Sequence, residues 1–306
     1  MALTTTGTVF VWGNGQQAQL GRRIIERRKV QGLNPERLAL RRIVCIGSGN
    51  YHSFAVNDRG DVYAWGLNSL KQAGVSEEYG GDADIIWTPT IVEALSPARL
   101  GGGRKVVQIS GGDHHTLFLL SDGSVWGCGR CDGFELGLGD DHPAMIAMRK
   151  RKREAAKAWL EEQKENGVEE PGDPPLMDDF IPEPVPILFP PPPSVSDPNP
   201  PVPAFTPDAF RGPIGSPIRQ ISAGTKFNLV VSRQGYVYAF GCGRSCELGL
   251  GPNVEEQMMP GRVRGETLDK IVGGRRWFVE AAHAGGQHCL LLARRVKVGE
   301  DVEMEG

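Results

Sequence analysis

The side chains best suited to proton transfer or hydrogen bonding are three histidines in one recurring context. His52, His115 and His288 each stand three residues after a glycine, and a mostly apolar stretch follows each of them. In a fourth copy of this context Phe227 takes the histidine position. A histidine that recurs in this way either satisfies buried backbone groups or lines a binding surface. Both interpretations stay open from the sequence, and the structural one is favoured for each residue.

Two cysteine pairs have spacings that invite a zinc interpretation. Cys128 and Cys131 form one pair, and Cys242 and Cys246 form the other. Structural zinc sites need several cysteine or histidine ligands that face one another. Cys128 instead takes a strand position that is aromatic elsewhere in the chain, and the second cysteines of the two pairs stand at different offsets. There is also no nucleophile elbow, phosphate loop or dinucleotide fingerprint. We therefore predict no catalytic residue, no metal, no cofactor and no small-molecule substrate.

One stretch of sequence occurs four times and sets the organisation of the chain. In each copy two glycines six positions apart bound a short apolar strand, and a third glycine follows eight positions later. The second copy, Gly60–Gly74, contains Trp65 and Gly66 at the end of its strand. The equivalent repeat residues in the other copies are Trp12, Gly13, Gly129 and Gly241. The histidine context precedes the copies at a fixed distance, so each unit combines both signatures.

Repeated units of this size predict a β-propeller. Two to four short strands joined by glycine turns make a small sheet that cannot bury its own faces, and radial stacking of such sheets solves the problem. The Gly13-type positions lie 53, 63 and 112 residues apart, so the third interval requires an insertion. The chain starts and stops within a unit, which leaves about four blades. A small closed four-bladed ring is the alternative to part of a larger ring.

The sequence of the repeats resembles that of a known family. Val11-Trp-Gly-Asn-Gly-Gln-Gln-Ala-Gln-Leu-Gly21 and Tyr63-Ala-Trp-Gly-Leu-Asn68 look like the repeats of the regulator of chromosome condensation family, and most like its fungal members. The likeness covers about residues 3–139 and 216–296. It implies an all-β, seven-bladed propeller, of which this chain is expected to be the C-terminal part.

The resemblance also implies a function. The founding member of the family is a chromatin-bound nucleotide exchange factor for the small GTPase Ran, and other members use the propeller as a binding scaffold. Carried over by register, Asp113, His115 and His288 are expected on the GTPase-facing rim, with His52 a weaker candidate. Chromatin or histones are possible further partners. The exchange wedge of the family lies in an N-terminal blade that precedes this stretch, so the sequence leaves exchange factor and scaffold as two hypotheses.

Composition and charge bear on the cellular location and the partners of the protein. The 306 residues carry a net charge of −3, so any contact with DNA would depend on local basic patches. No run of 18 apolar residues and no leader peptide is present, which predicts a soluble, non-secreted protein without a membrane partner. The six cysteines are then expected to be free thiols. The resemblance favours a nuclear location, with the cytoplasm as the alternative.

The repeat pattern breaks between residues 140 and 215. A charged helix is predicted over Ala144–Asn166, and its five-residue basic run, Arg149, Lys150, Arg151, Lys152 and Arg153, is either a nuclear import signal, a nucleic-acid contact or a solvated helix face. Seventeen of the 23 prolines follow, which predicts an extended or disordered segment that packs no core. The propeller resumes over 216–299, and 300–306 is an acidic tail. The arginine-rich linker 22–43 is predicted to be solvated.

Overall fold

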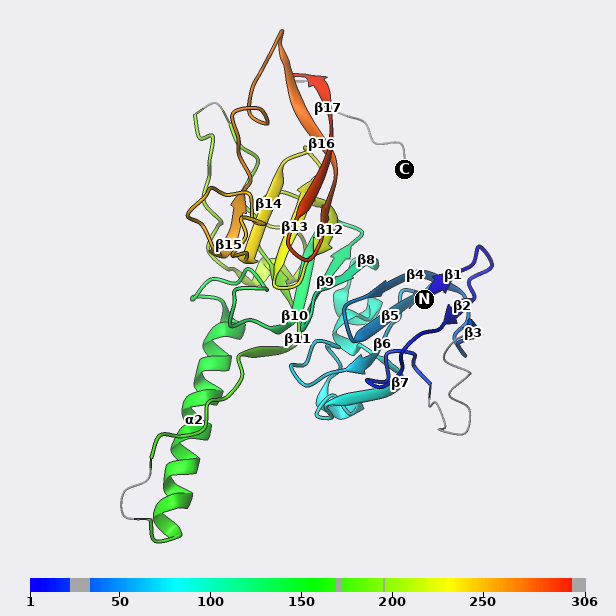
Figure 1. Cartoon of the computed structure of the whole chain (residues 1–306), viewed down its shortest axis with the longest axis vertical. Helices are drawn as coiled ribbons and strands as arrows, with labels where there is room; N and C mark the ends of the chain where they lie inside the picture. The colour runs from blue at the N-terminus through cyan, green and yellow to red at the C-terminus, as the bar shows by residue number, and fades with distance from the viewer. Residues whose placement is uncertain (23–33, 169–171, 195, 299–306) are drawn as a thin grey trace.

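The computed structural model describes residues 1–22, 34–168, 172–194 and 196–298. Half of the arginine-rich linker (residues 23–33) and the acidic tail (300–306) lie outside the described residues. The all-β prediction with a helical insertion is confirmed, because the described chain forms antiparallel sheets that follow one another in sequence (Figure 1).

Three sheets in the described chain have four strands each, and two smaller sheets flank them. The first complete sheet contains β4 (Ile43–Ser48), β5 (His52–Asn57), β6 (Val62–Leu67) and β7 (Ile85–Ile91). The second contains β8 (Val106–Gly111), β9 (His115–Leu120), β10 (Val125–Arg130) and β11 (Phe180–Ile187). The third contains β12 (Ile218–Ala223), β13 (Phe227–Ser232), β14 (Val237–Cys242) and β15 (Glu256–Arg262). The flanking sheets are β1 (Ala2–Leu3), β2 (Val9–Val11) and β3 (Glu36–Arg37), and β16 (Arg275–Ala284) with β17 (Cys289–Lys297).

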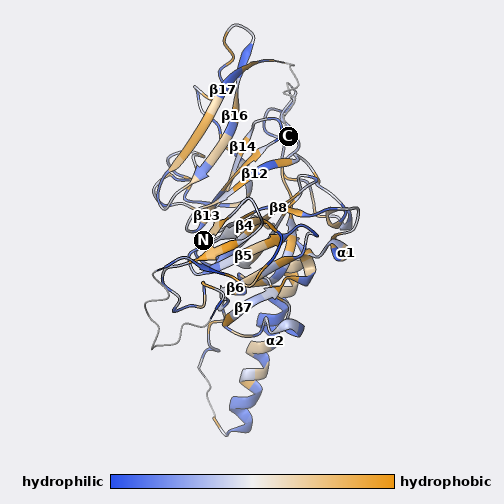
Figure 2. Ribbon diagram, turned by 90° about the vertical axis from the view of Figure 1, so that its right-hand side faces the viewer, coloured by the Kyte–Doolittle hydropathy of each residue, from blue (hydrophilic) through white to orange (hydrophobic). Residues whose placement is uncertain are grey.

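The core lies between sheets rather than within one. Every residue of β9 and of β13 is buried, because both faces of these strands are covered by neighbouring sheets. This explains why the strands read as continuous apolar runs without alternation. Phe54 of one sheet meets Phe118 of the next edge to face, with ring centroids 5.3 Å apart. Apolar residues accordingly concentrate in the sheets (Figure 2).

From β8 onward, the first strands of consecutive sheets lie side by side and are joined by a glutamine. Gln108 on β8 accepts a hydrogen bond from the backbone N–H of Ile221 on β12 (3.0 Å) and donates to its carbonyl (2.9 Å). Gln220 on β12 makes the same pair of bonds to Ala282 on β16, at 2.9 and 3.1 Å. The serine two positions later accepts from the next strand in both cases: Ser110 from Ala223 and Ser222 from Ala284, each at 2.9 Å. This paired signal was not recognised in the sequence.

The Pro-rich segment contributes a strand, which corrects the prediction that it packs no core. β11 pairs with β10 as the outermost strand of its sheet, and Ile181 and Ile187 are buried. Its prolines, Pro182, Pro184 and Pro186, recur every second residue. An outermost strand tolerates them because the N–H groups on its outer side have no ladder partner.

The insertion also contains the predicted helix. α2 spans Pro143–Glu165, within one residue of the expected range, and projects away from the sheets (Figure 1). Its N-cap is His142, whose Nδ1 accepts from the backbone N–H of Ala144 at 3.1 Å. The shorter helical pieces are η2 (Glu77–Tyr79), η3 (Glu93–Leu95), α1 (Pro97–Leu100) and η4 (Pro207–Phe210). None of the helices in the described chain is long and apolar enough to cross a membrane.

Candidate partner-binding face

The closing glycine of each of the first three arms provides space for the next sheet. A Cβ on Gly21 would lie 3.0 Å from Nε1 of Trp65, and one on Gly137 would lie 2.8 Å from the ring of Phe240. Trp65 Nε1 in turn donates to the carbonyl of Gln19 at 3.0 Å. Trp65, Cys128 and Phe240 are therefore buried between sheets, whereas Trp12 is 41% exposed because no described sheet precedes its own.

His52 and His115 link neighbouring sheets from fully buried positions. His52 Nε2 lies 2.8 Å from Thr116 Oγ1, and His115 Nε2 lies 2.9 Å from Asn228 Oδ1. Thr116 Oγ1 already donates to the carbonyl of Gln72, so it accepts from His52, and both histidines carry their proton on Nε2. Burial lowers the pKa of His52 to about 3 and that of His115 to about 4. Both rings are thus neutral and structural.

The residue after the histidine position completes the contact between the two sequence signatures. In each sheet its side chain donates to the backbone carbonyl of the glutamine or glutamate in the arm of the preceding sheet. The four pairs are Ser53 with Gln19 (3.1 Å), Thr116 with Gln72 (2.8 Å), Asn228 with Glu135 (2.7 Å) and Cys289 with Glu247 (3.1 Å). The fixed spacing of the two signatures therefore follows from their contact across the interface.

The glycines of the histidine context bring one set of loops together. A Cβ on Gly49 would lie 2.5 Å from the carbonyl oxygen of Gly112, and a Cβ on Gly112 would lie 2.5 Å from that of Gly224. The same construction places Gly224 at 2.9 Å from the carbonyl of Gly285. No larger residue fits without a shift, so the loops that follow these glycines meet on one face of the molecule.

Polar groups collect on this loop face, around a cavity of about 200 Å³. Asn50 donates from its side chain to the carboxylate of Asp113, and Asp113 N–H donates to the carbonyl of Thr225 at 3.1 Å. Asp113 is partly exposed and His288 is exposed. Of the four residues expected on the rim, Asp113 lies on this face, and the rings of His52 and His115 are buried between sheets. The His288 ring lies against Gly285 in the same register as those two histidines, and it is exposed. The GTPase-facing role of these residues stays a prediction.

His114 is a residue of this face that the sequence analysis missed. Its ring is partly exposed and its Nδ1 lies 3.4 Å from Nε2 of Gln72. Its pKa is lowered first by burial, while Asp113 raises it and Arg130 and Lys226 lower it further. Neighbouring residues of an extended chain point to opposite sides, so burial of His115 leaves His114 facing outward. The two adjacent histidines, His114 and His115, are the sequence feature that could have indicated an exposed ring here.

Charged groups surround His114. Arg130 binds Asp132 through two hydrogen bonds, one of them 2.6 Å between Nη2 and Oδ2. The hydrogen bond from Arg130 is the main reason why the pKa of Asp132 is lowered. Lys226 is exposed and lies close enough to affect both His114 and Asp132. The loop face therefore offers acidic, basic and neutral polar groups side by side, which suits recognition of a protein surface.

The basic run lies on the first half of α2, where three of its five side chains bind the rest of the insertion. Arg149 binds Asp140 and Lys152 binds Asp179. The Arg151 guanidinium stacks on the Phe180 ring, 4.5 Å from its centroid, and donates to the Phe180 carbonyl at 3.0 Å. The import-signal interpretation of this run stays a prediction.

The cysteines have the environments of core thiols. Cys128 Sγ lies 3.6 Å from the carbonyl oxygen of Gln72, and burial raises the pKa of its thiol. Burial also raises the pKa of Cys131 to about 12. Within the described ranges, no group of three or more histidine, cysteine, aspartate or glutamate residues is arranged to hold a metal ion.

Comparison with known proteins agrees with this geometry. Protein pim1 of Schizosaccharomyces pombe is 35% identical over 292 residues, which cover 95% of this chain and 43% of pim1. The guanine nucleotide exchange factor SRM1 of Saccharomyces cerevisiae is 29% identical over 264 residues, which cover 86% of this chain and 43% of SRM1. The chain thus spans less than half the length of these relatives.

The solved structures place the sheets in a known architecture. The crystal structure of Prp20p from Saccharomyces cerevisiae matches with a TM-score of 0.69 and 26% identity, covering 96% of this chain and 53% of Prp20p. The all-β propeller prediction is confirmed by this match, while the number of blades stays a prediction. The RCC1-like domain model matches residues 1–291. The chain therefore belongs to the RCC1-like domain family.

Proposed function

We propose that the chain is part of a guanine-nucleotide exchange factor for a Ran-type small GTPase and binds the GTPase through its loop face. The observation that carries the proposal is that the loops with Asn50, Asp113 and Thr225 meet on that face, beside the partly exposed His114, and are held together by glycines that admit no side chain. Support also comes from SRM1, which is named as an exchange factor, and from Prp20p, whose structure is described together with its binding to Gsp1p and histones.

Exchange of this kind needs no nucleophile. A factor accelerates nucleotide release by binding the nucleotide-free GTPase more tightly than the nucleotide-bound form, and the two binding free energies are coupled. The side chains of Asp113, His114 and Arg130 would supply charge complementarity to the GTPase. His52 and His115 are positioning residues in this proposal, because they fix the loops from inside the sheet interfaces.

Release of mant-GDP from a Ran-type GTPase tests the proposal. It is measured with this chain and with a version extended upstream, and the extended form is expected to accelerate release. The double variant Asp113→Ala/His114→Ala should weaken GTPase binding at least tenfold, whereas Lys157→Ala/Glu161→Ala on the projecting helix should leave it unchanged. A well-folded extended form that neither binds the GTPase nor releases nucleotide would contradict the proposal.

A non-catalytic scaffold is the second candidate, favoured by the large projecting insertion. GTPase binding without any acceleration of nucleotide release by the extended form, together with other captured proteins, would support it.

In either case we propose a nuclear location, in keeping with the binding of Prp20p to histones and with the complex of Kap60 and yeast RCC1. A fluorescent fusion in which Arg149–Arg153 are replaced by glutamine tests the basic run as an import signal. Unchanged nuclear signal would assign import elsewhere, and a cytoplasmic wild-type fusion would contradict the location.

A further inference from the structure

His142 joins three segments at the base of α2. Its Nδ1 accepts a hydrogen bond from the backbone N–H of Ala144, in the first turn of the helix, at 3.1 Å. Its Nε2 lies 3.2 Å from the carbonyl oxygen of Pro186 on β11, and its ring meets the Phe205 ring with centroids 4.4 Å apart. The residue is only 4% exposed. One buried side chain therefore holds the helix, the outer strand and the returning end of the insertion together.

The contact with Phe205 continues into the propeller. The Phe205 ring packs on Phe210 with centroids 5.9 Å apart, and Phe210 packs on Trp126 of β10 at 5.7 Å. Arg104 donates to the Phe210 carbonyl at 2.5 Å. Both ends of the insertion are thus fixed to the same sheet, and His142 is the residue that they share.

Only a neutral ring can make both hydrogen bonds of His142. A carbonyl oxygen can only accept, so Nε2 carries the proton and Nδ1 offers its lone pair to Ala144. A protonated ring has a donor on both nitrogens and would place one N–H against another. It would also put a positive charge at the N-terminus of a 23-residue helix, where the helix dipole disfavours cations. Protonation would therefore remove the N-cap of α2.

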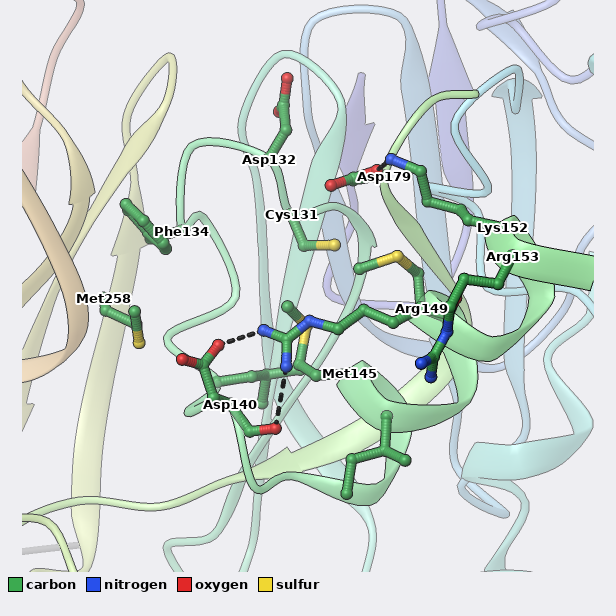
Figure 3. A pocket seen from close by; sticks show the side chains of 13 residues that line it. Cys131, Asp132, Phe134, Asp140, Met145, Arg149, Lys152, Arg153, Asp179 and Met258 are labelled. Carbon is green, nitrogen blue, oxygen red and sulfur yellow. Dashed lines mark hydrogen bonds and ion pairs between the residues drawn. The ribbon is translucent and has the colours of Figure 1, made fainter. Parts of the chain in front are cut away.

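The charged groups beside His142 on its own segment leave the ring neutral near pH 7. Burial lowers the pKa of the ring below its ordinary value of 6.5, against smaller opposing effects of the Pro186 carbonyl and the Asp141 carboxylate. Asp140 is bound to Arg149 of α2, as Figure 3 shows. The capped ring thus resists protonation, whereas a ring released from its site takes up a proton as the pH falls below 6.5.

The other elements around His142 present an uncharged carbonyl and an aromatic ring to it. Glu183 is the charged residue of β11, and it is exposed and lines a cavity on the side of the first complete sheet. On η4, Asp208 and Arg211 pair with each other at 3.5 Å. Titration of the site therefore depends on His142 itself and on its neighbour Asp141.

We propose that His142 acts as a proton-sensitive joint at the base of the insertion. With a neutral ring it caps α2 and fixes the helix to β11 and the returning segment, and with a protonated ring it releases the first turn of the helix. The basic run Arg149–Arg153 begins about two turns further along α2, so its position relative to the propeller depends on the state of this joint. The proposal is independent of nucleotide exchange, since no residue of the loop face takes part.

Hydrogen–deuterium exchange of the full chain tests the proposal. Protection factors of the amides of residues 144–146, which correct for the effect of pH on intrinsic exchange, are compared at about pH 7.5 and about pH 5.5. His142→Asn supplies a side-chain oxygen that can cap the helix at either pH, and His142→Ala supplies no cap at all. His283→Asn is the matched control, because His283 lies exposed on β16.

In the wild type the protection of these amides should fall about fivefold or more at the lower pH, because the opened state binds a proton that the capped state does not. The fall should vanish in His142→Asn and remain in His283→Asn. His142→Ala should have low protection at both pH values. Constant protection in the wild type, the same fall in His142→Asn, or full protection in His142→Ala would each overturn the proposal.

Discussion

Two interfaces between consecutive sheets use the same glutamine and serine pair but differ at the histidine position. Between β8–β11 and β12–β15 the buried ring is His115, which donates to Asn228. Between β12–β15 and β16–β17 it is Phe227, and the residue opposite is Cys289. In both interfaces the ring lies against a glycine, where a Cβ would come within 2.2 Å of His115 Cε1 or 2.5 Å of Phe227 Cε1.

The two interfaces distinguish the packing of a flat ring against a glycine from the hydrogen bond that a histidine ring adds. A flat ring over a glycine is common to both interfaces, so it is the basic requirement for bringing the loops together. The hydrogen bond is an addition that needs a matched acceptor on the next sheet: Thr116 or Asn228 where the ring is histidine, and none where it is phenylalanine. Three experiments test this division, in order of decreasing effect.

Substitution of the glycine under the ring should be the most damaging change. In Gly112→Ala the new Cβ would lie 2.2 Å from His115 Cε1 and 2.5 Å from the Gly224 carbonyl oxygen, neither of which can move freely. We expect the free energy of unfolding in urea to fall by about 3 kcal/mol or more, at the upper end of overpacking costs. Gly286→Ala is the control, because nothing lies within 4 Å of its Cβ, and should change stability by less than about 0.5 kcal/mol. Equal effects of the two variants would contradict the account.

Replacing His115 and Asn228 by the residue types of the second interface should measure how much the hydrogen bond contributes to stability. His115→Phe keeps the ring but leaves the Asn228 carboxamide oxygen buried without its donor, which costs about 1–3 kcal/mol. Adding Asn228→Cys recreates the pair found at Phe227 and Cys289. A double-mutant cycle should therefore give a favourable coupling of about 1 kcal/mol or more. Additive effects would show that the partner residue does not depend on the ring.

The same conversion should change the pH dependence of stability. Burial lowers the pKa of His115 to about 4, so below about pH 6.5, the ordinary histidine value, the unfolded state binds a proton that the folded state does not. The stability that is full above pH 6.5 is therefore lost as the pH falls toward 4. Each such histidine contributes a slope of about 1.4 kcal/mol per pH unit. Between pH 6.5 and 5, the free energy of unfolding of His115→Phe should depend on pH less steeply than that of the wild type, by about this amount. Identical slopes would argue against a neutral buried ring.

The repeated arms and the α2 helix were predictable because their signals have fixed spacing or strong periodicity. The outer strands were not. Pro89, Pro184 and Pro260 take equivalent positions on β7, β11 and β15, but they follow the closing glycine of their arms by 15, 47 and 11 residues. Because the distance from the closing glycine to the outer-strand proline varies, the proline does not fix the register of the outer strand. The sequence analysis therefore missed the strand within the Pro-rich insertion.

The candidate face was predictable in position but not in orientation. The register indicated the loop that carries Asp113, and Asp113 lies partly exposed on that face. It could not distinguish the outward His114 from the buried His115, since that choice depends on which side of the strand faces the next sheet. Likewise the glutamine and serine link at Gln108 and Gln220 becomes meaningful only when the two strands are known to be adjacent.

The prolines of the outer strands have a consequence for behaviour at high concentration. Each complete sheet ends in a strand with an open edge, and open edges recruit strands from other molecules and start aggregation. A proline removes one of the donors that such pairing requires, and β11 lacks three of them. The prolines that predicted an extended or disordered segment are thus the residues that disfavour strand pairing between molecules at the periphery of the propeller.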